Sequence, residues 1–423
     1  MDNLRTKTYS YPMSEKPIVR IFDRTTPPHV VTLVLLAGLS ALTMNIFLPS
    51  LPNMTAHFDT EYRLMQLSVA LYLGVNAVLQ IIVGPLSDKY GRRSILLVSI
   101  VLFLIATLGC IFATSVEMFL IFRMSQAVIV TGMVLSRAIV RDMVSQDEAA
   151  SMIGYVTMGM SVVPMIGPAL GGILDEAFGW QANFGMLIFT GVAILVLVWF
   201  DLGETAKPSG NSLGAQFREY PELLGSRRFW GYALAAAFAS GAFFAFLGGA
   251  PFVGTEVYNL SPSTLGLYFG LTALGYMLGN YLSGRYSVRV GINPMILYGT
   301  IAVTAGLTCS FLLILLGSTH PMAFFGLVSF VGLGNGMVIP NATAGMLSVR
   351  PHLAGTASGL GGAIMIGGGA ALSALAGALL VPGSGVYPLL AIMLATSAAA
   401  ILSVLYVLHI NRIAGELDGG ATE

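Results

Sequence analysis

The chain has 423 residues, of which 56% are apolar and only 9% are charged, and its formal net charge is zero. A soluble domain carries about 25% charged residues, so this composition excludes a soluble enzyme or binding domain and predicts an integral membrane protein in a lipid bilayer. The balanced charge excludes nucleic acid as a partner. The two cysteines, Cys110 and Cys309, lie in apolar segments and match no metal or disulfide spacing. We therefore expect no metal and no cofactor.

The first 28 residues are polar and contain prolines, which is untypical of a signal peptide and predicts a cytoplasmic tail. Twelve charge-poor segments follow, and each can supply the ~20 residues that a transmembrane helix needs. We expect an all-α integral membrane protein with 12 transmembrane helices, at roughly 30–51, 64–86, 94–114, 118–140, 150–174, 180–200, 229–253, 262–284, 293–317, 321–347, 353–380 and 387–408.

The basic residues indicate the orientation of these helices. If both termini are cytoplasmic, only Arg63 of the 20 Lys and Arg residues falls in an outer connection, while Arg123 and Arg137 lie within the fourth span. Cytoplasmic connections of membrane proteins carry an excess of Lys and Arg. The pattern therefore predicts twelve spans with both termini cytoplasmic.

The longest connection, Asp201 to Arg228, divides the spans into two sets of six. Its Leu213–Leu224 part predicts a short helix at the membrane surface. Paired six-helix halves are typical of transporters that rock around a central site. The expected domains are a cytoplasmic tail (1–28), an N-terminal six-helix bundle (29–201), a cytoplasmic linker (202–228), a C-terminal six-helix bundle (229–410) and a second cytoplasmic tail (411–423).

The two halves also repeat a short pattern. Gly84 and Gly91 are seven residues apart after the second span, and Gly284 and Gly291 are seven apart after the eighth. Upstream, Leu-Tyr-Leu-Gly at 71–74 corresponds to Leu-Tyr-Phe-Gly at 267–270, about one helical turn out of register. The repeat predicts two pseudo-symmetric bundles.

Four motifs resemble a known family. Gly84–Arg93 is similar to the loop between the second and third helices of the major facilitator superfamily, and Gly167–Gly172 (Gly-Pro-Ala-Leu-Gly-Gly) resembles the signature of its drug/proton antiporter branch. Arg123–Ala127 with Ser136–Asp142 resembles the fourth helix of the Bcr/CflA drug-resistance group, and Leu48–Pro52 resembles the end of that group's first helix. The resemblance implies a monomeric transporter of the bacterial inner membrane that exports small amphipathic drugs by alternating access, with proton coupling left open.

Arg123 is the clearest single candidate for function. A guanidinium within the membrane is costly and normally faces the interior of the protein or a wet cavity, although a long side chain can also reach back to the outer edge. The family resemblance implies a role for Arg123 in proton coupling and cavity organisation, and Gln126 lies one helical turn further on.

A substrate cavity needs a few polar groups near the middle of the membrane. We expect such groups, with an aromatic wall, among side chains whose alternative role is helix–helix packing or contact with lipid: Asn45, Tyr72, Asn76, Gln80, Tyr268, Tyr276, Asn280, Asn335 and Asn341, and Phe243, Phe244 and Phe246.

The resemblance also implies gating residues. Asp88, with Arg92 in the same loop, would bind the start of the eleventh helix around Thr356 when the cytoplasmic side is closed, because free backbone N–H groups suit a carboxylate. Arg137 and Arg141 would steady the same gate; their alternative is an ordinary basic helix end. In the fifth span, prolines and glycines predict a bent, closely packed helix, with these gate residues: Gly167, Pro168, Gly171 and Gly172.

One departure from the Bcr/CflA pattern concerns coupling. Asn45 stands where that group has an Asp, no acidic residue lies in the middle of any span, and we expect no buried carboxylate. Neutral, anionic or zwitterionic substrates therefore fit better than lipophilic cations, and a dedicated exporter of an anionic metabolite such as a carboxylate siderophore is the alternative. Proton coupling would depend on peripheral acids such as Glu117, on a charge of the substrate, or be absent. A membrane enzyme or a non-transporting sensor has less support, since no His, Asp or Glu cluster exists.

Overall fold

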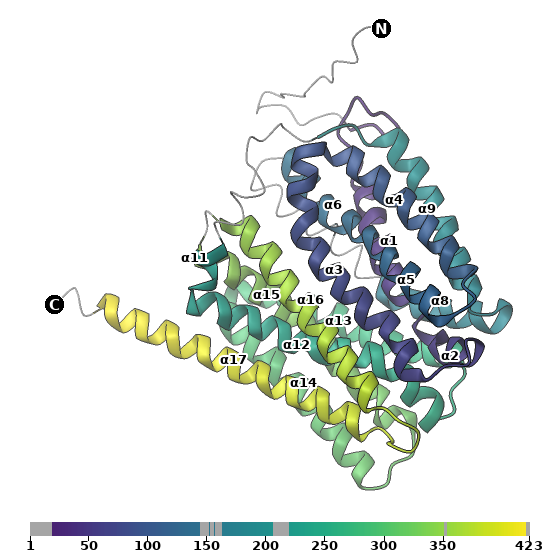
Figure 1. Ribbon diagram of the computed structural model, residues 1–423. Coiled ribbons are helices and arrows are strands. Elements are labelled where there is room, and N and C mark those ends of the chain that lie inside the picture. The colour runs from purple at the N-terminus through teal and green to yellow at the C-terminus, as the bar shows by residue number, and fades with distance from the viewer. Residues whose placement is uncertain are drawn as a thin grey trace.

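The computed structural model describes residues 19–143, 152, 156, 163–205, 220–350 and 353–419. All regular elements in these ranges are helices (Figure 1). The first part of the chain contains α1 (Val30–Asn45), the 3₁₀ turn η1 (Leu48–Ser50), α2 (Leu51–His57), α3 (Tyr62–Tyr90), α4 (Arg92–Ile111), α5 (Val116–Ser125), η2 (Gln126–Ile129), α6 (Val130–Met143), α8 (Val163–Phe178) and α9 (Gln181–Asp201). The second part contains α11 (Tyr220–Leu224), α12 (Arg227–Phe252), the π turn η3 (Val253–Val257), α13 (Pro262–Val290), α14 (Ile292–Leu315), η4 (Pro321–Ala323), α15 (Phe325–Val349), α16 (Ala354–Leu379) and α17 (Tyr387–Gly419).

Ten segments of the described chain are long and apolar enough to cross a membrane. The expected fifth and eighth spans, α8 and α13, are not among them: α8 has 16 described residues, and the many glycine, tyrosine and hydroxyl residues of α13 lower its mean hydropathy. The protein is therefore a multi-pass helical membrane protein. Twelve spans in two six-helix bundles remain an expectation.

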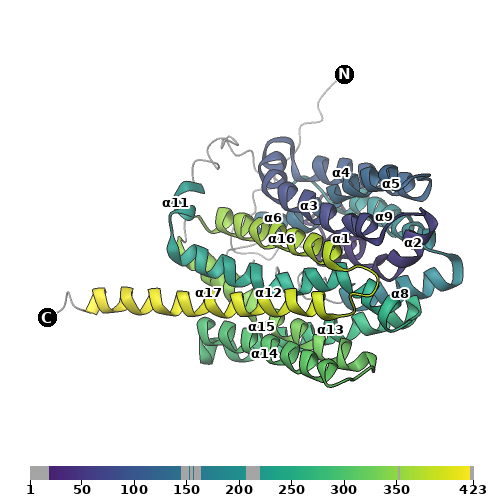
Figure 2. The ribbon, with the colours of Figure 1, turned by 60° about the horizontal axis from the view of Figure 1, so that its bottom comes forward.

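The helices lie in two groups (Figures 1 and 2). The first group consists of α1 to α9, drawn in purple to blue-teal, and the second consists of α12 to α17, drawn in teal to yellow. Two helix pairs join the groups, because α16 packs along α3 and α13 packs along α8. The interface between the groups is thus built mainly by α3 and α8 from the first group and by α13 and α16 from the second.

Helices α3 and α13 are structural repeats. Each has 29 residues, and each is preceded by a residue with positive φ, Asp59 at 45° and Asn259 at 51°. Each is followed by a glycine with positive φ, Gly91 at 91° and Gly291 at 93°, a conformation that side chains disfavour. All these positions correspond at a separation of 200 residues. The local match of 71–74 with 267–270 lies one turn out of this register, as the sequence indicated.

The connection between the groups is described in part. Helix α11 occupies the end of the expected Leu213–Leu224 helix, and the residues of that helix before Tyr220 lie outside the described ranges. At the start of α12, the Ser226 hydroxyl accepts a hydrogen bond from the Phe229 N–H, which satisfies one of the free donors at a helix start. Ser261 caps α13 in the same way, through Thr264.

Candidate functional site

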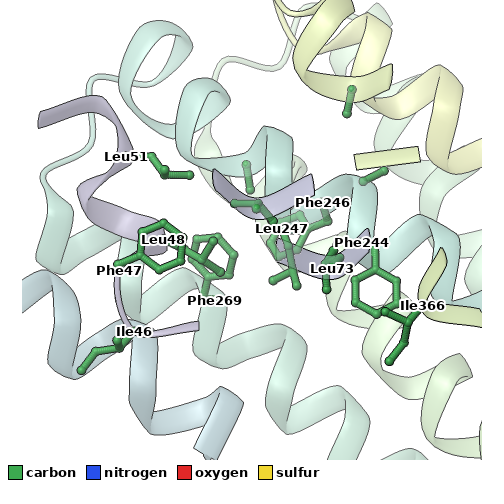
Figure 3. Close-up of a cluster of buried hydrophobic side chains, with 14 of the residues drawn as sticks. Ile46, Phe47, Leu48, Leu51, Leu73, Phe244, Phe246, Leu247, Phe269 and Ile366 are labelled. Carbon is green, nitrogen blue, oxygen red and sulfur yellow. The ribbon is translucent and has the colours of Figure 1, made fainter. Parts of the chain in front are cut away.

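Apolar side chains from both groups meet at one end of the interface. Phe47 and Leu48 of the first group lie near Leu247 and Phe269 of the second, with Leu73 of α3 beside them (Figure 3). These five side chains, here called the seal, are all at most 3% exposed. The turn η1, which carries Leu48, contacts both α12 and α13. The end of the molecule that contains the seal is the joined end.

Polar contacts between the groups accompany the seal. The Gln66 side chain on α3 donates from Nε2 to the carbonyl oxygen and the hydroxyl of Ser373 on α16, at 2.6 and 2.8 Å. The Tyr62 hydroxyl donates to the Gly248 carbonyl oxygen on α12 at 2.8 Å. These contacts connect the first turns of α3 to the second group, since Tyr62 begins that helix.

Contacts also join the second helix pair, α8 and α13. The Ser263 N–H, in the first turn of α13, donates to Glu176 Oε1 at the end of α8 over 3.1 Å. Close to it, Gly172 lies so near the Pro262 carbonyl that a Cβ at this position would be 2.1 Å from the oxygen. A side chain at Gly172 would therefore force α8 and α13 apart.

The other residues of the fifth-span motif show close packing as well. A Cβ on Gly171 would lie 1.7 Å from the Ile46 carbonyl oxygen, inside the first group. The Pro168 carbonyl oxygen faces Gly266 of α13, where a Cβ would be 2.3 Å away. Gly167 also packs against α1, with less crowding. The motif thus holds α8 against both its own group and the opposite one.

The opposite end of the interface contains the Asp88 loop. Asp88 forms an ion pair with Arg92 of its own group, and Arg92 also pairs with Asp142 at 3.1 Å. The Glu204 carboxylate accepts hydrogen bonds from the backbone N–H groups of Arg92 and Arg93, at 2.8 and 3.2 Å, at the start of α4. In this arrangement the partner of Asp88 is Arg92, whereas the expected partner was the start of α16 around Thr356.

Arg123 is completely buried within the first group. Its guanidinium lies between two aromatic rings, 4.2 Å from the centre of Phe47 and 4.1 Å from that of Tyr72. It donates to three oxygen atoms: the carbonyls of Thr43 and Ser68, at 3.0 and 3.3 Å, and Oε1 of Gln126 at 2.8 Å. The guanidinium faces the interior of the first group and does not reach back to the membrane edge. Its contact with Gln126 is present.

Two polar pairs occupy equivalent positions on α3 and α13. Gln80 donates from Nε2 to Asn76 Oδ1 at 2.8 Å, and Asn280 donates from Nδ2 to the Tyr276 carbonyl oxygen at 2.9 Å. Gln80 also reaches α16, where its Oε1 would be 3.0 Å from a Cβ on Gly362. These side chains lie near the middle of the two joining helices, as a substrate site between the groups requires.

Other polar candidates lie inside the groups. Tyr268 stacks on Phe325 with ring centres 4.9 Å apart, and Asn341 donates to Ser283 Oγ at 2.8 Å. Phe246 packs within the second group and is fully buried. Among the polar candidates in the described part of the chain, three have a buried oxygen atom without a hydrogen-bond partner, namely Asn45 Oδ1, Tyr72 Oη and Asn335 Oδ1. Unpaired buried polar atoms are rare in proteins, and binding sites are among their explanations.

The expectation that no carboxylate is buried is wrong. Asp175, in the last turn of α8, is 5% exposed and accepts a hydrogen bond from Asn53 Nδ2 at 2.8 Å. Asp201, at the end of α9, is fully buried and accepts from the N–H groups of Phe22 and His29 and from the Thr32 hydroxyl. Both lie at helix ends, where packing of neighbouring segments buries them, and hydropathy along a span does not record such packing.

A cavity of about 480 Å³ lies between α4 and α9, away from the interface. Its lining residues are apolar, and several of these residues are exposed on the outside of the first group. The lining residues are Leu97, Val98, Val101, Leu102, Leu195, Val196, Trp199 and Phe200. Without a polar group to orient a substrate, this groove fits lipid contact better than a transport site.

Comparison with known proteins settles the family. The profile of the Major Facilitator Superfamily matches residues 33–374. The chain belongs to the major facilitator superfamily. A bicyclomycin resistance protein homolog of Haemophilus influenzae is 27% identical over 351 residues, covering 82% of this chain and 88% of the relative. A chloramphenicol resistance protein of Pseudomonas aeruginosa is 28% identical over 333 residues, covering 77% and 79%.

The fold agrees with this assignment. A bacterial homolog of the human lysosomal transporter Spinster, solved in an inward-facing and occupied conformation, superposes with a TM-score of 0.68 at 17% identity, covering 90% of this chain and 96% of that chain. The superfamily consists of membrane transporters rather than enzymes. The resistance proteins among the relatives confirm the resemblance to Bcr/CflA-type drug-resistance transporters.

Proposed function

We propose that this superfamily member exports small amphipathic compounds, antibiotics among them, by alternating access. The observation that supports this most is the set of contacts at the joined end. The pairs α3–α16 and α8–α13 join the two groups at the seal, while at the other end Asp88 pairs within its own group. Two groups of helices held together by contacts that can break at one end are what a rocking transporter requires. The resistance proteins among the relatives support drug export.

The orientation follows from the basic residues. The Asp88 end carries Lys89, Arg92, Arg93 and Arg141, and an excess of Lys and Arg marks the cytoplasmic side. We assign the joined end to the outside, which makes this conformation inward-facing. Both termini, the tails 1–28 and 411–423 and the linker 202–228 are then cytoplasmic, in a bacterial inner membrane, with six-helix bundles at 29–201 and 229–410.

The transport step exchanges one set of contacts for another. Substrate enters from the cytoplasm and binds between the groups, beside the polar pairs of Asn76 with Gln80 and Tyr276 with Asn280. The outer end then opens as the Gln66 contact to α16 breaks. In that state Asp88 leaves Arg92 and binds the start of α16, which closes the cytoplasmic end.

Proton coupling is a separate part of the proposal. A proton carrier needs a carboxyl group that titrates on the transport path, and the buried Asp175 and Asp201 lie at helix ends instead. Counterflow and net transport in proteoliposomes, with and without a pH gradient, measure the coupling. Net transport that rises with an inwardly directed proton gradient supports antiport, and a rate indifferent to the gradient contradicts it.

A dedicated exporter of one anionic metabolite, such as a carboxylate siderophore, is the second candidate. The partly buried Arg137, a cation within a predicted span, favours it. A deletion strain separates the two functions. Broad sensitisation to unrelated antibiotics supports drug export, whereas unchanged susceptibility with accumulation of one metabolite inside the cells supports the dedicated exporter.

The direct test of export uses everted membrane vesicles that contain the protein. Radiolabelled chloramphenicol should accumulate in these vesicles faster than in vesicles without it, since everted vesicles import what the cell exports. Equal accumulation in both preparations, repeated with a panel of amphipathic antibiotics, would refute drug export.

A further inference from the structure

The apolar groove between α4 and α9 has an arginine at its cytoplasmic end. On α4 the groove runs from Leu97 to Leu102, about 8 Å at 1.5 Å per residue, and Arg93 lies one helical turn before Leu97. The Arg93 guanidinium carbon is 5.1 Å from the ring centre of Trp199, which lines the groove. Arg93 also donates from Nη2 to the Trp199 carbonyl oxygen at 3.3 Å. A positive charge therefore lies at the mouth of the groove.

The groove opens toward the lipid. Six of its lining side chains, among them Val98 and Trp199, are between 43% and 56% exposed. Trp199 lies two residues before the end of α9, and tryptophan is enriched at the headgroup level of membranes. The volume of about 480 Å³ falls within the range of ~300–1,000 Å³ that ligand sites occupy. The groove thus begins near the headgroups and leads into the hydrocarbon layer, as the first part of an acyl chain does.

A second arginine lies beside the same end of α9. Arg93 Nε donates to the Leu202 carbonyl oxygen at 2.8 Å. The next residue, Gly203, packs so closely on the carbonyl oxygen of Arg24 that a Cβ would not fit between them. The segment before α1 therefore brings Arg24 to the residues that hold Arg93, and Arg24 is exposed.

The acids on these segments bind other groups. Asp23 accepts hydrogen bonds from the N–H and the hydroxyl of Thr25. The Glu204 carboxylate accepts from the backbone N–H groups of Arg92 and Arg93. Within the described ranges, Arg93 takes part in none of the ion pairs. Its charge remains available to an anion from the membrane.

The second group shows that the arginine is not required by the helix itself. Helix α14 begins at Ile292, 200 residues after Arg92 begins α4. The residue that corresponds to Arg93 is Asn293, whose Oδ1 accepts a hydrogen bond from the Tyr232 hydroxyl at 2.8 Å. A helix of this type thus starts with a neutral residue at the same position, so the charge of Arg93 calls for another explanation.

We propose that the groove, with Arg93 and Arg24 at its mouth, binds an anionic phospholipid of the cytoplasmic leaflet. The guanidinium of Arg93 binds the phosphate, which accepts paired, charge-assisted hydrogen bonds, and part of one acyl chain lies along the groove. Basic pockets beside transmembrane helices on the cytoplasmic side bind lipid headgroups in this way. A zwitterionic lipid carries its own cation next to the phosphate and binds less well. The site lies wholly within the first group and does not depend on which compound is transported.

The tryptophan in the site reports its occupancy. Replacing Trp180 and Trp230 by phenylalanine leaves Trp199 as the one tryptophan of the chain. This parent protein is placed in phosphatidylcholine vesicles with increasing fractions of brominated phosphatidylglycerol or brominated phosphatidylcholine, whose bromine atoms quench a tryptophan that they contact. The quenching curves give the affinity of the site for the anionic lipid relative to the zwitterionic one. This ratio is expected to be about fivefold or more, the effect of one arginine at an anionic headgroup.

The variants separate the headgroup contact from general lipid contact. Arg93→Gln is expected to lower the ratio about fivefold and Arg93→Lys to retain part of it. Because both lipids are read by the same tryptophan, a small shift of Trp199 cancels in the ratio. The control is Arg289→Gln, which removes a charge from an exposed position at the end of α13 in the other group and is expected to leave the ratio unchanged.

Two results would overturn the inference: a ratio of one in the parent protein, or a ratio that Arg93→Gln leaves unchanged. Native mass spectrometry of the wild-type protein, released from micelles that contain both lipids in equal amounts, gives the same answer without the tryptophan substitutions. Preferential retention of phosphatidylglycerol supports the site, and equal retention of the two lipids contradicts it.

Discussion

Replacing Gly172 by alanine is expected to open the joined end. The new Cβ would lie 2.1 Å from the Pro262 carbonyl oxygen and 2.8 Å from Ser263 Cα. Both neighbours are backbone atoms at the start of α13, so no flexible side chain can move aside. Helices α8 and α13 must therefore separate, which weakens the form with a closed joined end relative to a form in which the two helices are already apart.

The size of the shift follows from the crowding. Overpacking a tight contact costs about 1–3 kcal/mol. Because the contact joins the two groups, this cost falls on the closed form of the joined end alone. An equilibrium that changes by about 1–3 kcal/mol shifts about 5- to 150-fold, so the population with an open joined end is expected to rise by that factor.

Cysteine labelling measures this population. Ser373 is fully buried at the joined end, so a Ser373→Cys thiol reacts with a membrane-impermeant maleimide only when that end opens. The exposed Cys309 is first replaced by serine, while the buried Cys110 stays. Labelling from the outside is expected to be about 5 to 150 times faster with Gly172→Ala than without it.

Two other glycine-to-alanine substitutions serve as controls. Gly74→Ala adds a methyl group to α3 where no atom lies within 4 Å, and it is expected to leave the labelling rate unchanged. Gly171→Ala collides with the Ile46 carbonyl inside the first group, so it is expected to lower thermal stability more than it opens the joined end. Labelling of Gly172→Ala at the rate of Gly74→Ala would refute the reasoning.

Two further predictions concern buried charges. Arg123→Met is expected to lower the free energy of unfolding by about 1–3 kcal/mol, because Gln126 and the rings of Phe47 and Tyr72 lose their partner. Thermal melting in detergent checks this, and a melting temperature equal to that of wild type would contradict it. Asp201→Asn is expected to loosen the segment before α1, since the amide cannot accept all three hydrogen bonds that the carboxylate accepts. A loss of about 1.4 kcal/mol in the stability of this segment would make limited proteolysis there about tenfold faster. Unchanged cleavage would argue against the prediction.

The helical class and the positions of the loop glycines could be predicted from sequence because both depend on short stretches of the chain. Long runs without charge mark the spans, and Gly91 and Gly291 mark turns that require positive φ. The residue-by-residue correspondence between α3 and α13 was harder to predict from the sequence. A four-residue match suggested a separation one turn shorter than that of the glycines, and only the equal helix lengths show which correspondence is structural.

The candidate site could be predicted in part. The sequence identified the polar residues of the spans by type and by depth in the membrane. It could not show that Asn76, Gln80, Tyr276 and Asn280 lie on the joining helices near their middle while Tyr268 and Asn341 pack inside the second group, because that depends on how each helix is rotated about its axis. The enclosure of Arg123 and the burial of Asp175 arise from contacts between distant segments. Such contacts have no sequence period, so the sequence indicated an interior position for Arg123 without most of its partners, and it predicted no buried acid.

The central claim is that the joined end must open during transport. A disulfide between Gln66→Cys and Ser373→Cys, in the Cys309→Ser background, tests it most directly, because the native side chains at these positions already make hydrogen bonds of 2.6 and 2.8 Å. Oxidation is expected to stop counterflow of chloramphenicol, and reduction to restore it, while either single cysteine transports in both conditions. A fully cross-linked protein that transports at the rate of its reduced form would contradict the account.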